Sequence, residues 1–219
     1  KHENKRLAIC PTLYCTKFCR LCNGCLHPIM KLYQHDIEQC LNILQKGGLI
    51  LYPTDTVWGI GCDAQNKGAV EKIFNLKKRN EKKSMIVLIA DESEITQFTN
   101  EAFPTVFDFI KGVHKPVTVV YPKAKNLAPN LLNADGSIAI RIVKKGFAKD
   151  LLKKFGKPIV STSANLSGYP APGNFYDVDI AIKKGVSYVV EFSRDVQKIA
   201  SPSTVVTVDA KGKIIILRP

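Results

Sequence analysis

Three short segments of the sequence gather residues that could bind a small polar or anionic ligand. The first is residues 52–61 (YPTDTVWGIG), which holds two threonines, an aspartate and two glycines directly after a short apolar run. Threonine hydroxyls both donate and accept hydrogen bonds, and glycines let a ligand approach the backbone closely. The same composition is also typical of a tight turn beside a buried tryptophan, so this segment alone leaves both interpretations open.

The second segment is residues 77–84 (KKRNEKKS), with five cations and one acid. Arginine offers a planar fork of donors and lysine a compact charge, a combination that suits a polyphosphate. A charge run is often only a solvated surface. The position of residues 77–84 between a predicted helix and a strongly apolar strand favours a binding role for this segment.

The third segment is residues 159–168 (IVSTSANLSG), where an apolar strand runs into four hydroxyl side chains and one amide. Such groups can donate to carboxylate or phosphate oxygens without adding charge. Helix or turn capping would account for one of them, but not for five polar groups within so short a stretch.

Further candidates lie at strand ends. Arg141 closes the apolar segment 137–141 and needs an anionic partner there, while Ser203, Thr204 and Arg218 frame the last two strands. The sequence has no Ser-His-Asp spacing, no zinc-binding His-x-x-x-His and no Gly-Lys-Ser/Thr phosphate loop. The residues therefore indicate a pocket for a nucleotide and a small carboxylate-bearing molecule, without revealing the reaction.

The elements that must position these residues alternate between strands and helices. Asp36 is a predicted N-cap of a helix that ends at Gly47-Gly48. Further helices are predicted over residues 67–78, 102–110, 147–155 and 178–184, and strands over 49–52, 84–90, 117–121, 138–142, 159–161, 188–192, 204–209 and 214–217. Helices between strands, with a hairpin at the end, predict an α/β fold: one twisted mixed sheet with helices packed on it.

Composition narrows the class of protein. The 219 residues carry 32 Lys+Arg against 19 Asp+Glu, a net charge of +13, and 45% of them are apolar. These values fit a globular domain with an ordinary core and a polyanionic partner, either nucleotide or nucleic acid. No apolar run approaches the roughly 18 residues of a membrane span, so we expect no membrane association.

The first 29 residues differ from the rest. They contain five of the seven cysteines, and Cys15, Cys19, Cys22 and Cys25 have spacings that could ligate zinc or an iron–sulfur cluster, with His27 nearby. The alternative, which we favour, is a leader outside the native fold, because Met30 starts a more ordinary sequence. We therefore expect a Cys-rich extension over residues 1–29 and one domain over 30–219, with Cys40 and Cys62 as reduced thiols.

Taken together, residues 53–59 (PTDTVWG), Lys77-x-Arg79, 138–141 (IAIR), 161–168 (STSANLSG) and 202–206 (PSTVV) resemble the YrdC-like threonylcarbamoyl-AMP synthase family, in its short single-domain form. The resemblance implies a sheet around a basic cavity and a cytoplasmic nucleotidyltransferase. This enzyme would make threonylcarbamoyl-AMP and pyrophosphate from L-threonine, bicarbonate or CO2, and ATP with Mg²⁺. The product would serve modification of tRNA adenosine 37 through downstream transfer proteins, and tRNA or double-stranded RNA is a further expected partner.

The resemblance also assigns residues. It places Thr56, Arg141, Ser161 and Ser203 on threonine, with Arg141 facing its carboxylate, and places Arg79, Lys83, Ser137, Ser163 and Arg218 on ATP. Lys77, Arg79, Ser163 and Asn165 form the implied catalytic set. The sequence departs from the family pattern at three places: Trp58, Asn80 and His114-Lys115-Pro116.

Two other functions stay open at this stage. One is a non-catalytic RNA-binding module of the same fold, which the net charge of +13 would also suit. The other is a carbamoyl-transfer domain related to those of hydrogenase maturation, although the cysteine spacing is too short for the paired zinc fingers of those proteins.

Overall fold

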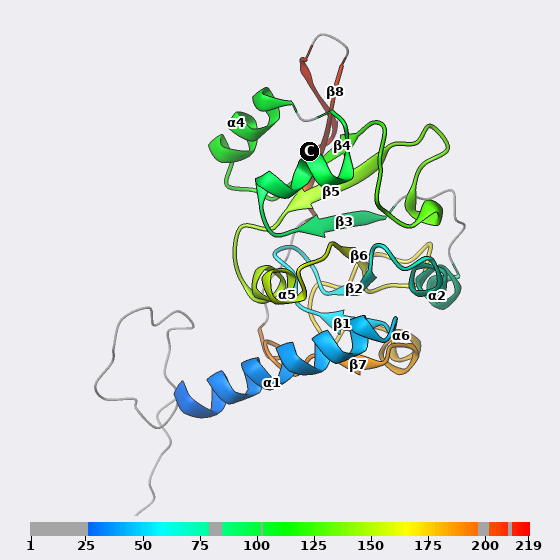
Figure 1. The fold of residues 1–219 in the computed structure, drawn as a ribbon. Helices are drawn as coiled ribbons and strands as arrows, with labels where there is room; N and C mark the ends of the chain where they lie inside the picture. The colour runs from blue at the N-terminus through cyan, green and yellow to red at the C-terminus, as the bar shows by residue number, and fades with distance from the viewer. Residues whose placement is uncertain (1–25, 79–84, 102, 197–201, 210–211) are drawn as a thin grey trace, which may run out of the picture.

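A computed structural model describes residues 26–78, 85–101, 103–196, 202–209 and 212–219. Over these residues one sheet of nine strands runs through the molecule in the order β7-β1-β2-β6-β3-β5-β4-β8-β9 (Figure 1). The strands are β1 Ile50–Tyr52, β2 Gly59–Asp63, β3 Ile86–Ile89, β4 Val117–Tyr121, β5 Ile138–Ile142, β6 Ile159–Ser163, β7 Tyr188–Val189, β8 Thr204–Val208 and β9 Ile214–Arg218. The predicted α/β class and mixed sheet are confirmed, since β1–β7, β3–β5 and β4–β8 pair in parallel and the other neighbours are antiparallel.

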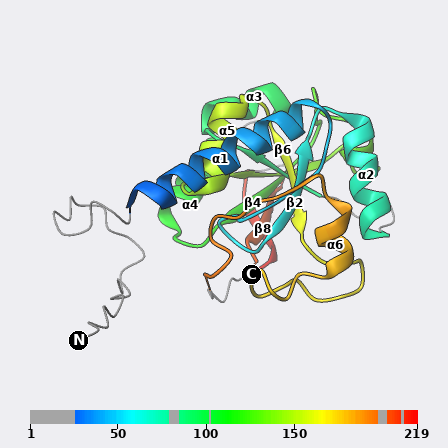
Figure 2. The same cartoon turned by 90° about the horizontal axis from the view of Figure 1, so that it is seen from below.

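The helices lie against this sheet. They are α1 Leu26–Gln45, α2 Lys67–Lys77, α3 Ile95–Phe98, α4 Pro104–Gly112, α5 Phe147–Phe155 and α6 Ile180–Gly185, with short 3₁₀ turns η1 Glu92–Glu94 and η2 Pro129–Leu131. Figure 2 shows α1 and α5 together on one face of the sheet. Each buries an apolar stripe, as amphipathic helices on a sheet must. None of the described helices is long and apolar enough to cross a bilayer.

One strand was not predicted from the sequence. Segment 59–63 (GIGCD) forms β2, between β1 and β6, although glycine disfavours strands. Position 61 must be glycine because β1 and β2 pack closely: a Cβ on Gly61 would lie 2.7 Å from Cε1 of Tyr52. The Tyr52 ring therefore occupies the space that a side chain at position 61 would need.

The start of the first helix was also predicted wrongly. α1 begins at Leu26, so it runs across the expected boundary between residues 29 and 30, and Asp36 lies inside it instead of capping it. The predicted apolar stripe of Ile37, Cys40 and Leu44 is buried as expected. The cysteines proposed as metal ligands lie outside the described residues.

Asp36 instead holds the 188–192 segment. Its side chain is fully buried and accepts hydrogen bonds from the Tyr188 hydroxyl (2.7 Å) and from the backbone N–H groups of Glu191 (3.0 Å) and Phe192 (2.7 Å). The carboxylate accepts from backbone N–H groups as it would at a helix N-terminus, but these N–H groups lie more than 150 residues further along the chain. A local pattern cannot reveal that partner.

We expect Asp36→Ala to lower the free energy of unfolding by about 2–4 kcal/mol, because it leaves buried N–H groups without an acceptor. Chemical denaturation measures this directly. The matched control is Glu38→Ala on the exposed side of the same helix, which should change stability by less than about 0.5 kcal/mol. Equal effects of the two substitutions would contradict this role of Asp36.

Candidate functional site

The register of the sheet places the predicted site residues on one face. Residues directly opposite each other on neighbouring strands point to the same side of a sheet. Ser161 pairs with Gly61 and with Ile86, Ile86 pairs with Ala139, and Arg141 lies two residues beyond Ala139 on β5. Ser161 and Arg141 therefore project from the same face, and Ser163, two residues beyond Ser161, shares it.

The segment between β1 and β2 turns over the end of this face. The Thr54 hydroxyl donates to the Val57 carbonyl (2.6 Å), accepts from the Thr56 N–H (3.1 Å) and contacts the Thr56 hydroxyl at 3.0 Å. Gly59 allows the turn to approach β6, because a Cβ there would lie 3.0 Å from Oγ of Ser161. The turn thus places Gly59 and Thr54 beside Ser161, and Thr56 is joined to Thr54 within the turn.

Arg141 is almost completely buried and forms an ion pair with Asp55. Arg141 Nη2 lies 3.1 Å from Asp55 Oδ1, and the two side chains are 4% and 15% exposed. Neither Nε of Arg141 nor Oδ1 of Asp55 has a hydrogen-bond partner of ordinary geometry among the described residues. Sequence analysis predicted that Arg141 needs an anionic partner, but it did not identify Asp55 as that partner.

Tyr52 lies beside this ion pair. Burial raises the pKa of its phenol, and the neighbouring Ser161 and Arg141 side chains oppose this shift without cancelling it. Its hydroxyl is also buried without a hydrogen bond of ordinary geometry in the part of the chain that the structure describes. Sequence analysis included Tyr52 as the first residue of the 52–61 segment and as the end of a strand, but gave its phenol no role.

The other end of the face is built by β4, β8 and β9. The Thr118 and Ser203 hydroxyls are 2.8 Å apart and buried, and Arg218 Nη2 donates to the Ser203 carbonyl at 3.0 Å. Ser203 and Arg218 were predicted to bind different substrates, and the structure brings them together. Thr118 was missed, although a lone hydroxyl within the apolar run of β4 was visible in the sequence.

Lys77 and Asn165 organise the loop that follows β6. Lys77 is 1% exposed, and its ammonium donates to the backbone carbonyls of Ser163 and Asn165. The Asn165 amide donates to the carbonyls of Leu166 (3.0 Å) and Tyr169 (2.6 Å), and the Ser167 N–H donates to the Lys77 carbonyl (3.0 Å). Both side chains hold the loop in shape, so their implied contact with ATP stays a prediction.

Of the remaining predicted site residues, the structure describes Ser137 and the two cysteines but not the two basic residues assigned to ATP. Ser137 directly precedes β5, where its hydroxyl donates to Asp135 (2.6 Å) and accepts from Asn133 (2.9 Å). Arg79 and Lys83 lie outside the described residues. Cys40 and Cys62 are buried free thiols, and no cluster of three or more His, Cys, Asp or Glu side chains that could hold a metal occurs in the described part of the chain.

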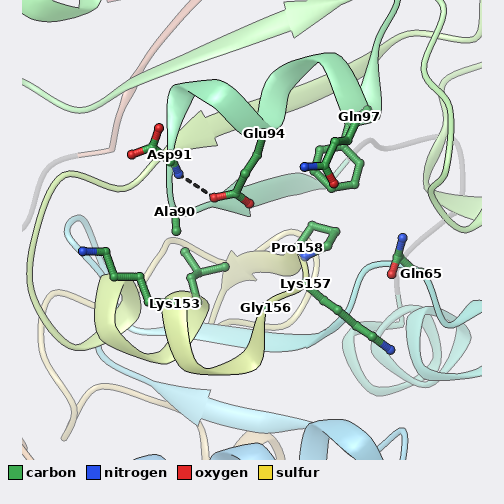
Figure 3. A pocket seen from close by; sticks show the side chains of 11 residues that line it. Gln65, Ala90, Asp91, Glu94, Gln97, Lys153, Gly156, Lys157 and Pro158 are labelled. Carbon is green, nitrogen blue, oxygen red and sulfur yellow. Dashed lines mark hydrogen bonds between the residues drawn. The ribbon is translucent and has the colours of Figure 1, made fainter.

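A pocket of about 320 Å³ lies elsewhere, between the η1–α3 segment and the end of α5 (Figure 3). Asp91, Glu94, Lys153 and Lys157 line it, and Pro158, at its edge, immediately precedes β6. In the candidate site, Ser163 lies at the opposite end of that strand and Ser161 at its middle. Glu94 already accepts a hydrogen bond from the Asp91 N–H, and Lys157 lies 3.4 Å from Asp63. This pocket is therefore separate from the predicted site.

Comparison with known proteins places the chain in a family. The model of the Sua5/YciO/YrdC family, described as "Telomere recombination", matches residues 42–219. The chain belongs to this family. The Sua5/YciO/YrdC match covers all the described site segments and begins within α1, so it includes neither residues 1–25 nor the cysteines there.

Relatives in this family carry a consistent name. A threonylcarbamoyl-AMP synthase of Photobacterium profundum is 35% identical over 162 residues, which cover 71% of this chain and 86% of that protein. A threonylcarbamoyl-AMP synthase of Psychromonas ingrahamii is 28% identical over 180 residues, covering 81% and 94%. The likeness thus extends over most of both proteins.

Solved structures of Sua5/YciO/YrdC members share the fold. P. abyssi Sua5 in complex with L-threonine superposes with a TM-score of 0.75 at 25% identity, and E. coli YciO with a TM-score of 0.72 at 24% identity. Each match covers 84% of this chain, which spans 53% of the Sua5 chain and 89% of YciO. A nucleotide-bound HypF matches at 20% identity with a TM-score of 0.69, a likeness that shows the fold alone.

Proposed function

We infer that this chain is a threonylcarbamoyl-AMP synthase, which joins L-threonine, bicarbonate or CO2, and ATP and releases pyrophosphate. The observation that carries the inference is the buried Arg141 on a sheet face that it shares with Ser161 and Ser163. This arrangement suits a small carboxylate with a hydroxyl. The names of the relatives and the L-threonine bound to P. abyssi Sua5 support the same substrate.

The reaction requires two bonds to form. The threonine amine attacks the carbon of CO2 and loses a proton, which gives a carbamate. A carbamate oxygen then attacks the α-phosphorus of ATP, and the bond to the departing pyrophosphate breaks. Orientation of the reactants and cationic stabilisation of phosphate charge can supply most of the catalysis, so a histidine base is not required.

We propose that the residues divide between the two substrates. Thr56, Arg141, Ser161 and Ser203 would hold threonine, while Arg79, Lys83, Ser137, Ser163 and Arg218 would hold ATP. Lys77 and Asn165 would act through the loop after β6, which is supported by their hydrogen bonds to its backbone. ATP would enter as its Mg²⁺ complex, so the metal belongs to the substrate and the enzyme acts as a nucleotidyltransferase.

We also propose which reaction consumes the product and where in the cell it is made. Threonylcarbamoyl-AMP is an activated acyl adenylate, so a transferase must consume it, and the family points to proteins that modify adenosine 37 of tRNA. L-threonine, bicarbonate, ATP and tRNA are all present in the cytoplasm, which supports a cytoplasmic location for the enzyme. The net charge of +13 supports weak binding of tRNA or another RNA in addition.

Pyrophosphate release should require L-threonine, bicarbonate and ATP together, and EDTA should abolish it by removing Mg²⁺. Pyrophosphate release and detection of the adenylate by mass spectrometry test this, with L-serine and L-valine as control amino acids. Arg79→Ala should remove the activity because it removes a cation from the triphosphate. Tight RNA binding without adenylate formation would support the RNA-binding module, and activity that depends on carbamoyl phosphate would support the hydrogenase-maturation type.

A further inference from the structure

The Asp55–Arg141 ion pair has a feature that the family assignment leaves unexplained. Arg141 is the expected partner of the threonine carboxylate, yet its guanidinium lies 3.1 Å from the carboxylate of Asp55. A substrate carboxylate must therefore bind where a protein carboxylate already lies. Two carboxylates close to one arginine repel each other unless a further positive charge is present.

The ion pair is not saturated by its surroundings. Arginine and carboxylate groups commonly meet through two parallel hydrogen bonds, which use both partners fully. Here Nε of Arg141 has no hydrogen-bond partner among the described residues, and the 3.1 Å contact of its Nη2 with Asp55 Oδ1 does not reach hydrogen-bond geometry. The Tyr52 hydroxyl beside them interacts with Ser161, also without a hydrogen bond of ordinary geometry. Buried polar atoms of this kind normally have partners, because each costs about 1–3 kcal/mol when left alone. An unpaired donor on Arg141 and an acceptor on Asp55 that is held only loosely leave this place able to bind a ligand with both donors and acceptors.

The two charges differ in accessibility in a way that suits such a ligand. Asp55 keeps more exposure than Arg141, 15% against 4%. It lies in the turn between β1 and β2, next to Thr54, whose hydroxyl fixes the turn through its bond to the Val57 carbonyl. Asp55 is thus held at the open side of the pair, where an incoming ligand can reach it.

We propose that Asp55 binds the α-ammonium group of the substrate amino acid while Arg141 binds its carboxylate. The two charges of a zwitterionic amino acid then match the two charges of the protein, and the ammonium removes the repulsion between the carboxylates. Asp55 is thereby a specificity-determining residue that selects α-amino acids over simple hydroxy acids. This inference rests on the proposed function, because it concerns the same threonine site.

The test compares L-threonine with 3-hydroxybutanoate, which keeps the carboxylate and hydroxyl but lacks the ammonium. Isothermal titration calorimetry measures both affinities for the unmodified protein, for Asp55→Asn and for Asp108→Asn, the same change at an exposed site on α4. The unmodified protein and Asp108→Asn should prefer threonine by about 10- to 100-fold, the usual effect of one charge-assisted hydrogen bond. Asp55→Asn should reduce this preference to about threefold or less, by weakening threonine binding and leaving or improving binding of the hydroxy acid.

Two results would overturn the inference for different reasons. If Asp55→Asn weakens both ligands by the same factor, Asp55 acts only by holding Arg141, and it does not bind the ammonium. If the unmodified protein binds neither ligand, the proposed function itself fails, and the inference fails with it. Should Asp55→Asn not fold, Asp55→Glu keeps the charge and must retain the preference for threonine; loss of that preference in a folded Asp55→Glu protein would equally contradict the proposal.

Discussion

Replacing Arg141 by alanine is expected to weaken L-threonine binding by about two to three orders of magnitude and to remove threonine-dependent pyrophosphate release. Truncating one partner of a buried charge interaction typically costs about 2–5 kcal/mol of binding, and each 1.4 kcal/mol corresponds to about tenfold in affinity. Arg141 is nearly inaccessible to water, so no solvent screening softens the loss. Calorimetric titration with threonine and the pyrophosphate assay measure the two effects.

The same substitution should also destabilise the fold, because Asp55 then remains largely buried without its cation. Breaking a buried pair costs about 3–5 kcal/mol, and we expect a loss of about 2–3 kcal/mol here because Asp55 keeps some contact with water. The double variant Arg141→Ala/Asp55→Ala should regain part of the stability but none of the threonine binding. Recovery of binding in the double variant would show that Arg141 serves the fold and not the substrate.

Much of the fold is predictable from the sequence because its patterns are local. The strands β4 and β5 and the helix α5 have the predicted bounds. Each strand is a short, mostly apolar run, and α5 is an amphipathic segment with a glycine at each end. The unpredicted strand β2 needs glycine at position 61 to admit the ring of Tyr52, and this requirement comes from a neighbouring strand. The N-cap prediction for Asp36 failed for the same kind of reason, because its hydrogen-bond donors lie near the other end of the chain.

The candidate site is predictable only in part for a related reason. Sequence motifs identify which residues carry polar groups, and the sheet register explains why Ser161 and Arg141 share a face. The motifs do not show which group pairs with which. Asp55 lay within a motif and received no role, although it forms an ion pair with Arg141 at 3.1 Å. Pairings over such separations follow from the topology of the chain and not from spacing.

Replacing Lys77 by methionine is expected to lower both stability and activity. The ammonium of Lys77 donates to the carbonyls of Ser163 and Asn165, and methionine fills a similar volume without a donor. Two buried carbonyls would lose charge-assisted hydrogen bonds, which are worth about 1.5–3 kcal/mol each, so we expect a loss of about 2–5 kcal/mol after relaxation. The loop after β6 would then no longer hold Ser163 in place, and kcat should fall by about 10- to 100-fold, as misplaced groups of this kind commonly cause.

The size of the stability change distinguishes two roles of Lys77. If it positions the loop, Lys77→Met lowers the denaturation midpoint together with kcat, and a matched Lys111→Met on α4 does neither, because Lys111 forms only an exposed ion pair with Glu92. If Lys77 acts instead by contacting ATP, activity is lost while stability stays unchanged, since a surface of contact with substrate contributes nothing to folding in its absence. The burial of Lys77 and its bonds to backbone carbonyls favour the first outcome, because a lysine already committed to two carbonyls has little donor capacity left for a phosphate.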